Sequence, residues 1–120
     1  MSGQPIYQQI MERIERDIIT GAYEADGLIM STTQIAKFYS VNHTTAVKAV
    51  GKLADAGILY KKRGIGMCVA VSAREKIMAR RRDVFLNQSL GAMMAEAAAL
   101  GISVEELIRY IQEMEGQRND

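Results

Sequence analysis

Residues 28–71, LIMSTTQIAKFYSVNHTTAVKAVGKLADAGILYKKRGIGMCVAV, carry the pattern that specifies the fold of this chain. The S-x-x-Q capping box at Ser31 predicts a helix that runs to about Phe38. Asn42 is a favourable N-cap for a second helix, which Gly57 closes. Because only three or four residues separate the two predicted helices, the pattern is typical of a helix-turn-helix.

The end of this stretch predicts a β-hairpin. Two short β-type runs, residues 58–61 and 67–71, flank a turn that contains glycine. Gly64 permits a positive φ in that turn and lets the backbone approach a partner closely. Lys62 and Arg63 lead into the turn, so its tip suits contact with phosphates. A single G-x-G without a following Lys-Ser/Thr helix start is no nucleotide-binding loop.

These elements together predict an N-terminal winged helix-turn-helix DNA-binding domain over residues 1–71, in a fold that is mainly α with a small β-hairpin. Such a domain is used mainly to place its second helix in a groove of DNA. On that helix the inward apolar stripe is formed by Ala46, Val50, Leu53 and Ala54, with Val47 at its edge. The opposite arc carries the candidates for groove contacts, which are Thr44, Thr45 and Lys48.

The chain on either side of this stretch is predicted to be helical. Isoleucines recur at helical spacing after Pro5 and predict a scaffold helix that stops at Gly21. Residues 72–120 predict two helices with apolar stripes, which have little to pack on within a winged domain. We predict a two-helix dimerisation tail; the alternative is a tail that folds back on its own domain. The candidate interface residues are Leu90, Met93, Met94, Ala97, Leu107, Ile108 and Ile111.

The composition bounds the class of protein. A chain of 120 residues, 48% hydrophobic and 24% charged, is typical of one globular domain, or of one small domain with an appendage. It has no run of 18 or more apolar residues and no signal-peptide core, so no membrane partner is expected. The single cysteine, Cys68, excludes an intrachain disulfide and fits a reducing cytoplasm. We interpret Cys68 as buried packing rather than a redox sensor.

The charge is unevenly distributed. Residues 60–82 carry eight basic side chains and one acidic side chain, whereas the net charge of the whole chain is +1. A basic segment between neutral and acidic ones predicts an anionic partner that meets one surface. For Arg80, Arg81 and Arg82 the alternative is a solvated, charged helix face.

Motifs spread over nearly the whole chain carry a family resemblance. They are Pro5-Ile6-Tyr7-Gln8-Gln9-Ile10, Gly21-x-Tyr23, Val41-x-x-Thr44-Thr45, Leu53-x-x-x-Gly57-Ile58-Leu59, the wing Lys61-Lys62-Arg63-Gly64-Ile65-Gly66-Met67, Ala73-Arg74-Glu75-Lys76 and Leu100-Gly101-Ile102-Ser103. In their order and spacing the chain resembles the GntR family of bacterial winged-helix regulators, and within it the short YtrA-like branch.

The resemblance implies how the chain acts. It implies insertion of the second helix in the major groove of double-stranded DNA, wing contact in the adjacent minor groove, and a homodimer on a palindromic operator. It also implies repression, commonly of transporter genes. Most relatives carry a large C-terminal effector domain, which we do not expect in a chain of 120 residues. No cofactor is expected, and any effector is unknown. The DNA contacts that it implies are at Ser31, Thr33, Asn42, His43, Thr44, Thr45, Lys48, Lys62, Arg63 and Gly64.

The chain departs from the family at three arginine positions. Thr33, His43 and Val47 stand where the family usually has arginine. A bidentate Arg–guanine contact is worth about 1–3 kcal/mol of discrimination, and threonine cannot make one. Because Thr44 and Lys48 remain, we expect an altered operator or weaker binding rather than lost function.

His43, Met93 and Met94 also have predicted roles. His43 is interpreted as a DNA contact; the alternatives are a pH-responsive or metal role and an ordinary surface histidine. No further ligands stand at metal-ligand spacing, so no metal is expected. Met93 and Met94 are interpreted as core or interface, and a methionine-rich seam could also hold a small apolar effector.

Competing functions differ in their sequence requirements. One histidine, one cysteine and no catalytic arrangement of serine, histidine and aspartate argue against an enzyme. A winged helix used for protein contact, as an adaptor or antirepressor, is the main alternative, because the family arginines are missing. A sequence-blind nucleoid protein would be expected to carry a larger positive charge than +1.

Overall fold

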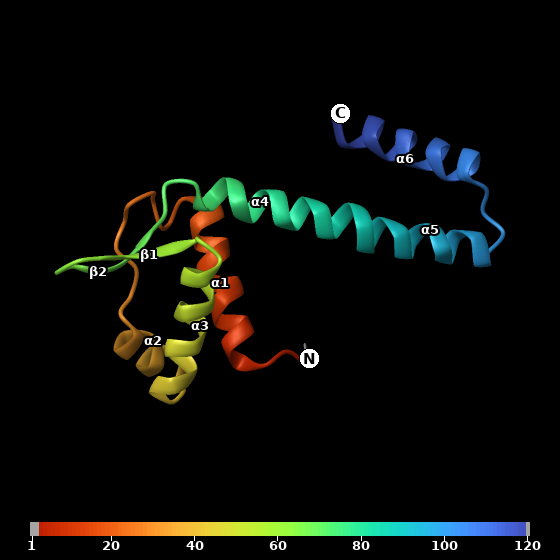
Figure 1. The fold of residues 1–120 in the computed structure, drawn as a ribbon. Coiled ribbons are helices and arrows are strands. Elements are labelled where there is room, and N and C mark those ends of the chain that lie inside the picture. The colour runs from red at the N-terminus through yellow and green to blue at the C-terminus, as the bar shows by residue number, and fades with distance from the viewer. Residues whose placement is uncertain (1–2, 120) are drawn as a thin grey trace. The chain divides into compact units, whose positions relative to one another are not determined.

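The computed structural model describes residues 3–119, and Figure 1 shows their helices and strands. In chain order these are α1 (Ile6–Thr20), α2 (Thr32–Tyr39), α3 (His43–Asp55), β1 (Leu59–Lys62), β2 (Gly66–Val69), α4 (Ala73–Val84), the π-helical η1 (Phe85–Ser89), α5 (Leu90–Ala99) and α6 (Val104–Asn119). The contacts divide the chain into two compact units, Met1–Arg80 and Arg81–Asp120. The predicted fold class is confirmed: a mainly helical chain with one hairpin and a helical tail.

The helix-turn-helix forms from local sequence signals. The Ser31 hydroxyl oxygen accepts a hydrogen bond from the Gln34 N–H at 3.1 Å, and the Gln34 side chain accepts one from the Ser31 N–H at 2.9 Å. This confirms the predicted capping box. The helix α2 ends at Ser40, whose left-handed backbone (φ +53°) turns the chain. The helix α3 then starts within three residues, so the two helices are joined by the short turn that the sequence predicted.

The hairpin is a two-stranded antiparallel sheet, with Leu59 opposite Val69 and Lys62 opposite Gly66. The loop before α2 runs beside β2: Leu28 forms an isolated bridge with Cys68. A side-chain contact also holds this loop, because the Tyr60 hydroxyl on β1 donates a 2.6 Å hydrogen bond to the Asp26 carboxylate in it. That bond raises the pKa of Tyr60 to about 12.

The core of the first unit draws on α1, α2, α3, the hairpin and the start of α4. One cluster of buried side chains contains Ile10, Ile14, Ile18, Ile29, Ile35, Ala46, Ala49, Val50, Leu53, Ile58, Leu59, Val69, Ala73 and Ile77. Of the predicted inward stripe of α3, Ala46, Val50 and Leu53 are buried, together with Ala49, whereas Ala54 is half-buried. Val47, predicted at the edge of that stripe, is instead 46% exposed.

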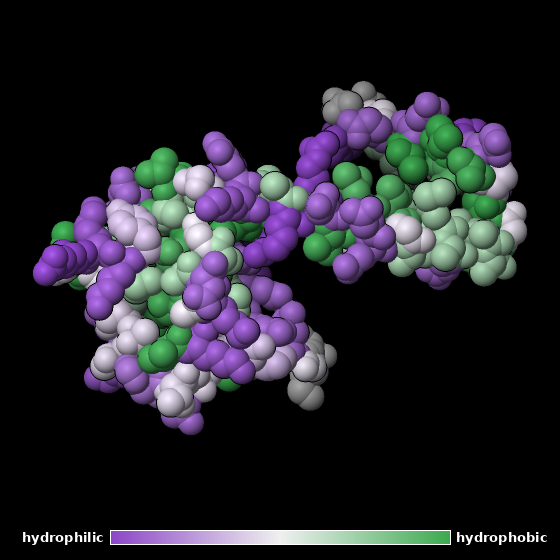
Figure 2. Space-filling view, in the orientation of Figure 1, coloured by the Kyte–Doolittle hydropathy of each residue, from purple (hydrophilic) through white to green (hydrophobic). Residues whose placement is uncertain are grey.

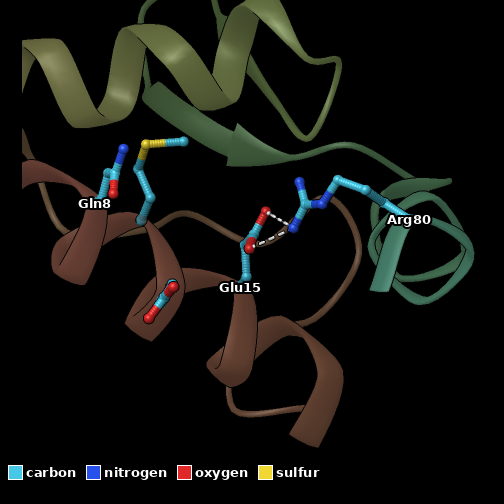
Figure 3. Close-up of a pocket in the computed structure, with 5 residues that line it drawn as sticks. Gln8, Glu15 and Arg80 are labelled. Carbon is cyan, nitrogen blue, oxygen red and sulfur yellow. Dashed lines mark hydrogen bonds and ion pairs between the residues drawn. The ribbon is translucent and has the colours of Figure 1, made fainter. Parts of the chain in front are cut away.

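A partly buried ion pair joins α1 to α4 in the first unit. Glu15 of α1 is 3% exposed, and the Arg80 Nη2 of α4 donates to both of its carboxylate oxygens at 2.6 and 2.7 Å. Figure 3 shows the guanidinium reaching across to α1, beside a pocket of about 220 Å³ that Gln8 and Met11 also line. Arg80 therefore holds α4 to α1 through this ion pair, while 48% of its side chain stays exposed.

The second unit is a helical hairpin with little interior. The helical backbone is unbroken from Ala73 to Ala99, as predicted, but it contains the π-helical turn η1, which the sequence did not indicate. Gly101 (φ +77°) then reverses the chain, and the Ser103 hydroxyl oxygen caps α6 by accepting from the Glu106 N–H. Figure 1 shows α6 running back along α5, and Figure 2 shows apolar side chains on the surface of this unit.

Candidate nucleic-acid interface

The N-termini of α2 and α3 lie together on the surface of the first unit. The Thr32 hydroxyl and the His43 Nε2 are 3.1 Å apart and share a hydrogen bond that joins the first residues of the two helices. Three of the predicted contact residues, Ser31, Thr33 and His43, are exposed around this junction. His43 thus bridges two elements in addition to being available at the surface.

The sequence predicted that the side chain of Asn42 caps α3, and this prediction is wrong. Asn42 occupies the N-cap position but accepts no hydrogen bond from the helix backbone. Its Oδ1 instead accepts hydrogen bonds from the hydroxyls of Thr44 and Thr45, at 3.1 and 2.8 Å. The amide groups of the first turn of α3 are therefore left without a side-chain cap. Such a helix start, with its partial positive charge, attracts anions such as phosphate.

The exposed face of α3 continues from this start along the helix. Thr44, Val47, Lys48 and Gly51 are exposed, one turn apart or adjacent to one another. The Lys48 ammonium lies 4.2 Å from the centroid of the Tyr7 ring of α1. The sequence gives no sign of a site role for Tyr7, because the contact of Tyr7 with α3 depends on how the two helices pack.

The hairpin tip brings the second group of predicted residues to the surface. Arg63 and Gly64 are exposed and Lys62 is half-buried. Gly64 has φ +79°, the positive value that the sequence predicted, and the Ile65 N–H donates to the Lys62 carbonyl to close the turn.

A hollow connects the hairpin tip to the helix-turn-helix. This pocket of about 250 Å³ is lined by residues of the wing, of the loop before α2 and of the start of α2: Leu28, Ile29, Ser31, Thr32, Gln34, Ile65, Gly66 and Met67. Thr32 also bonds His43 at the start of α3. The starts of α2 and α3 and the wing therefore border one continuous surface, which we call the reading surface.

Part of the predicted basic segment serves the structure of the first unit. The Arg74 Nε donates to the Ile19 carbonyl at 3.1 Å, and the Lys76 ammonium donates to the Gly57 carbonyl at 3.4 Å. Arg80 pairs with Glu15. Arg74, Lys76 and Arg80 are thus engaged by their own unit, although all three stay exposed and still add positive charge to its surface.

Between residues 3 and 119, no group of three histidine, cysteine, aspartate or glutamate side chains could hold a metal ion. Within the same residues, no helix is long and apolar enough to cross a membrane.

A helix-turn-helix followed by a basic hairpin defines a winged-helix DNA-binding protein. The chain belongs to the GntR family of bacterial regulatory proteins, whose family model matches residues 6–69. It is therefore a transcriptional regulator of that family and not an enzyme, as the sequence predicted.

Relatives extend the similarity beyond the winged domain. The HTH-type transcriptional repressor YtrA of Bacillus subtilis is 24% identical over 124 residues, which cover 99% of this chain and 95% of YtrA. A crystal structure of a GntR-family regulator from Bacteroides thetaiotaomicron is 35% identical, with a TM-score of 0.78, and covers 97% of this chain and 100% of that one. The DNA-binding domain of AraR, solved in complex with an operator, is 33% identical with a TM-score of 0.53, over 56% of this chain and 81% of AraR's domain.

Proposed function

We propose that the protein represses transcription as a homodimer on a palindromic operator. In this proposal residues 1–71 bind double-stranded DNA and residues 72–120 form the dimer. The observation that carries it is the reading surface, on which two helix starts and a basic hairpin tip lie together. The name of YtrA as a repressor supports the sign of regulation. The resemblance to the YtrA-like branch favours transporter genes as targets.

The start of α3 is suited to the major groove. Asn42 gathers the hydroxyls of Thr44 and Thr45, so their hydrogens are held while their oxygens can still accept from base edges. The uncapped amides of the first turn suit a backbone phosphate. We assign Thr44 to a base edge and Lys48 to a phosphate or guanine on the same side of the helix.

The wing and the start of α2 are suited to the sugar-phosphate backbone. Lys62 and Arg63 bring charge to the hairpin tip, and Gly64 has no side chain to keep its backbone away from the minor groove. Ser31 and Thr33 offer hydroxyls at the start of α2. Contacts of this kind set affinity and register and carry no sequence information directly.

The changed family arginines bear on the operator. Thr33 and His43 are exposed on the reading surface and cannot make the bidentate fork that recognises guanine. We therefore propose an operator that differs from those of arginine-bearing relatives at the corresponding base pairs.

The second unit supplies the surface for dimerisation. Four of the seven predicted interface residues are exposed, namely Met93, Met94, Ile108 and Ile111. Leu90 and Leu107 are half-buried, and Ala97 is buried within its own chain. A patch of this kind on a small helical hairpin marks an interaction site. A second copy fits it best, since a twofold dimer supplies two recognition helices for half-sites about 34–36 Å apart.

The proposal is tested by fluorescence anisotropy with DNA from upstream of the protein's own gene, against a scrambled duplex. Binding should favour the upstream DNA and weaken steeply between roughly 50 and 200 mM salt. Lys62→Ala should weaken both duplexes alike and reduce the salt slope by about 1. Thr44→Ala should weaken only the upstream DNA.

Each outcome has a defined meaning. Equal losses on both duplexes from both substitutions would contradict the division between base and phosphate contacts. If the upstream DNA contains no operator, a duplex selected from a randomised pool replaces it as the probe. Absence of binding at low salt to either kind of DNA would favour a winged helix that contacts protein.

A further inference from the structure

An aliphatic side chain lies exposed in the middle of the proposed DNA-contacting face. Val47 is 46% exposed, whereas Ala46 and Val50 on the same helix are buried in the core. Thr44 lies one turn before it and Gly51 one turn after it, both exposed. Val47 therefore lies outside the buried core, although valine is a poor helix former compared with the straight-chain polar residues.

The neighbouring polar side chains make contacts that do not cover Val47. The ammonium groups of Lys48 and Lys52 lie 4.2 and 5.7 Å from the centroid of the Tyr7 ring, so both lysines extend toward α1. The Thr44 hydroxyl donates to Asn42. These contacts leave the Val47 methyl groups as an accessible apolar surface on α3.

Gly51 indicates that this face comes close to a partner. It lies inside α3 with helical geometry, and a Cβ placed there would meet no atom within 4 Å. Nothing within the first unit therefore requires glycine, which destabilises a helix interior relative to alanine. A residue without a side chain lets the backbone approach an external surface closely.

We infer that Val47 contacts the 5-methyl group of a thymine in each half-site of the operator, and so favours thymine over cytosine there. This inference rests on the proposed function. The thymine methyl is an apolar group presented on base edges in the major groove, and aliphatic side chains are its ordinary contact. Valine has no hydrogen-bond donor, so it cannot recognise the acceptors of guanine as an arginine at this position would. It can recognise only an apolar group on the base edge.

The experiment removes the methyl group alone. A duplex is selected from a randomised pool with the wild-type protein, and each thymine is replaced in turn by uracil, which lacks only the 5-methyl. Dissociation constants are measured for wild type and Val47→Ala. Replacement of one symmetric pair of thymines should weaken wild-type binding about fourfold per half-site, as expected for loss of one buried methyl. Val47→Ala, which keeps only one methyl group farther from the base, should show a clearly smaller difference between the methylated and demethylated duplexes than wild type.

Val71→Ala is the matched control, because Val71 is an exposed valine outside α3 and should leave the uracil effect intact. The inference is overturned if selection yields an operator and no thymine shows the effect, or if Val47→Ala retains it in full. If selection enriches no sequence, the proposed function fails instead, and the inference falls with it. Thermal unfolding of Val47→Ala checks that an exposed substitution has left the fold unchanged.

Discussion

The two compact units cover their apolar side chains to very different degrees. In residues 3–80, a single cluster of isoleucine, leucine, valine and alanine side chains is buried from α1 through to α4. Among residues 81–118, only Ala97 is buried, and large side chains such as Met94, Ile108 and Met114 remain in solvent. The first unit is therefore stabilised by its own contacts. The second unit is rich in apolar side chains but is too small to bury them within itself. Dimerisation would bury them against a second copy.

The largest expected effect tests the core of the first unit. Leu53 is fully buried, so Leu53→Ala should lower the free energy of unfolding by about 2–5 kcal/mol through lost burial and a residual cavity. Leu100 is 69% exposed in the second unit. Leu100→Ala should cost under about 0.5 kcal/mol at concentrations where the chain is monomeric. Urea unfolding followed by circular dichroism measures both, and similar losses would erase the contrast between the units.

The next effect tests whether a second copy covers the tail. Ile108→Glu places a charge in the proposed interface, so we expect the dimer to dissociate about 100-fold more readily, which is about 2.7 kcal/mol. Light scattering coupled to size exclusion measures the mass. Gln112→Glu is the matched control, since it adds the same charge at another exposed position of α6. A dimer that survives Ile108→Glu unchanged would show that the exposed face of α6 is not the interface.

A smaller effect has opposite signs on stability and binding. Gly51→Ala should stabilise the first unit by about 0.5–1 kcal/mol, because alanine is the better helix former and has open space there. It should nevertheless weaken operator binding, since the added methyl stands between α3 and the DNA. Thermal unfolding and anisotropy give the two numbers. Gly116→Ala in α6 also meets open space and should leave DNA affinity unchanged; improved binding by Gly51→Ala would refute close approach.

The smallest effect concerns the loop that borders the hairpin. The hydrogen bond to Asp26 raises the pKa of Tyr60 to about 12, and it favours the protonated phenol of the folded chain. Its contribution to stability is therefore complete below pH about 10, the ordinary tyrosine value, and is lost as the pH rises through about 12. Ultraviolet titration should show one of the five tyrosines ionising last. Tyr60→Phe should abolish that late step and Tyr110→Phe in the second unit should not.

Local rules predicted most of the fold, and packing determined what they missed. The capping box at Ser31, the short turn before α3 and the positive φ of Gly64 depend on neighbouring residues, so the sequence indicated them correctly. The hydrogen bonds of Asn42 with two threonine hydroxyls are equally local. They compete with capping of α3 by the same side chain, and the sequence pattern does not show which of the two is more stable.

Features that depend on distant partners could not be predicted. Arg80 bonds Glu15, which lies 65 positions earlier in the chain, so its place in a run of arginines suggested only an anionic partner or a solvated face. The exposure of Val47 follows from the angle at which α3 packs on α1, and the Tyr7–Lys48 contact follows from the same packing. The positions predicted to contact DNA remain predictions, although Thr32, which the sequence did not single out, links two of their elements through His43.

The buried thiol of Cys68 can serve as a probe of how often the hairpin opens. Cys68 is the single cysteine of the chain, is 1% exposed, and lies on β2 between Tyr60 on β1 and the bridge to Leu28. A thiol reagent reaches it only when these strands separate, so the rate of its modification measures how often the wing opens. The native chain therefore carries its own probe of wing dynamics, and protection of Cys68 on addition of DNA would report engagement of the wing without any label.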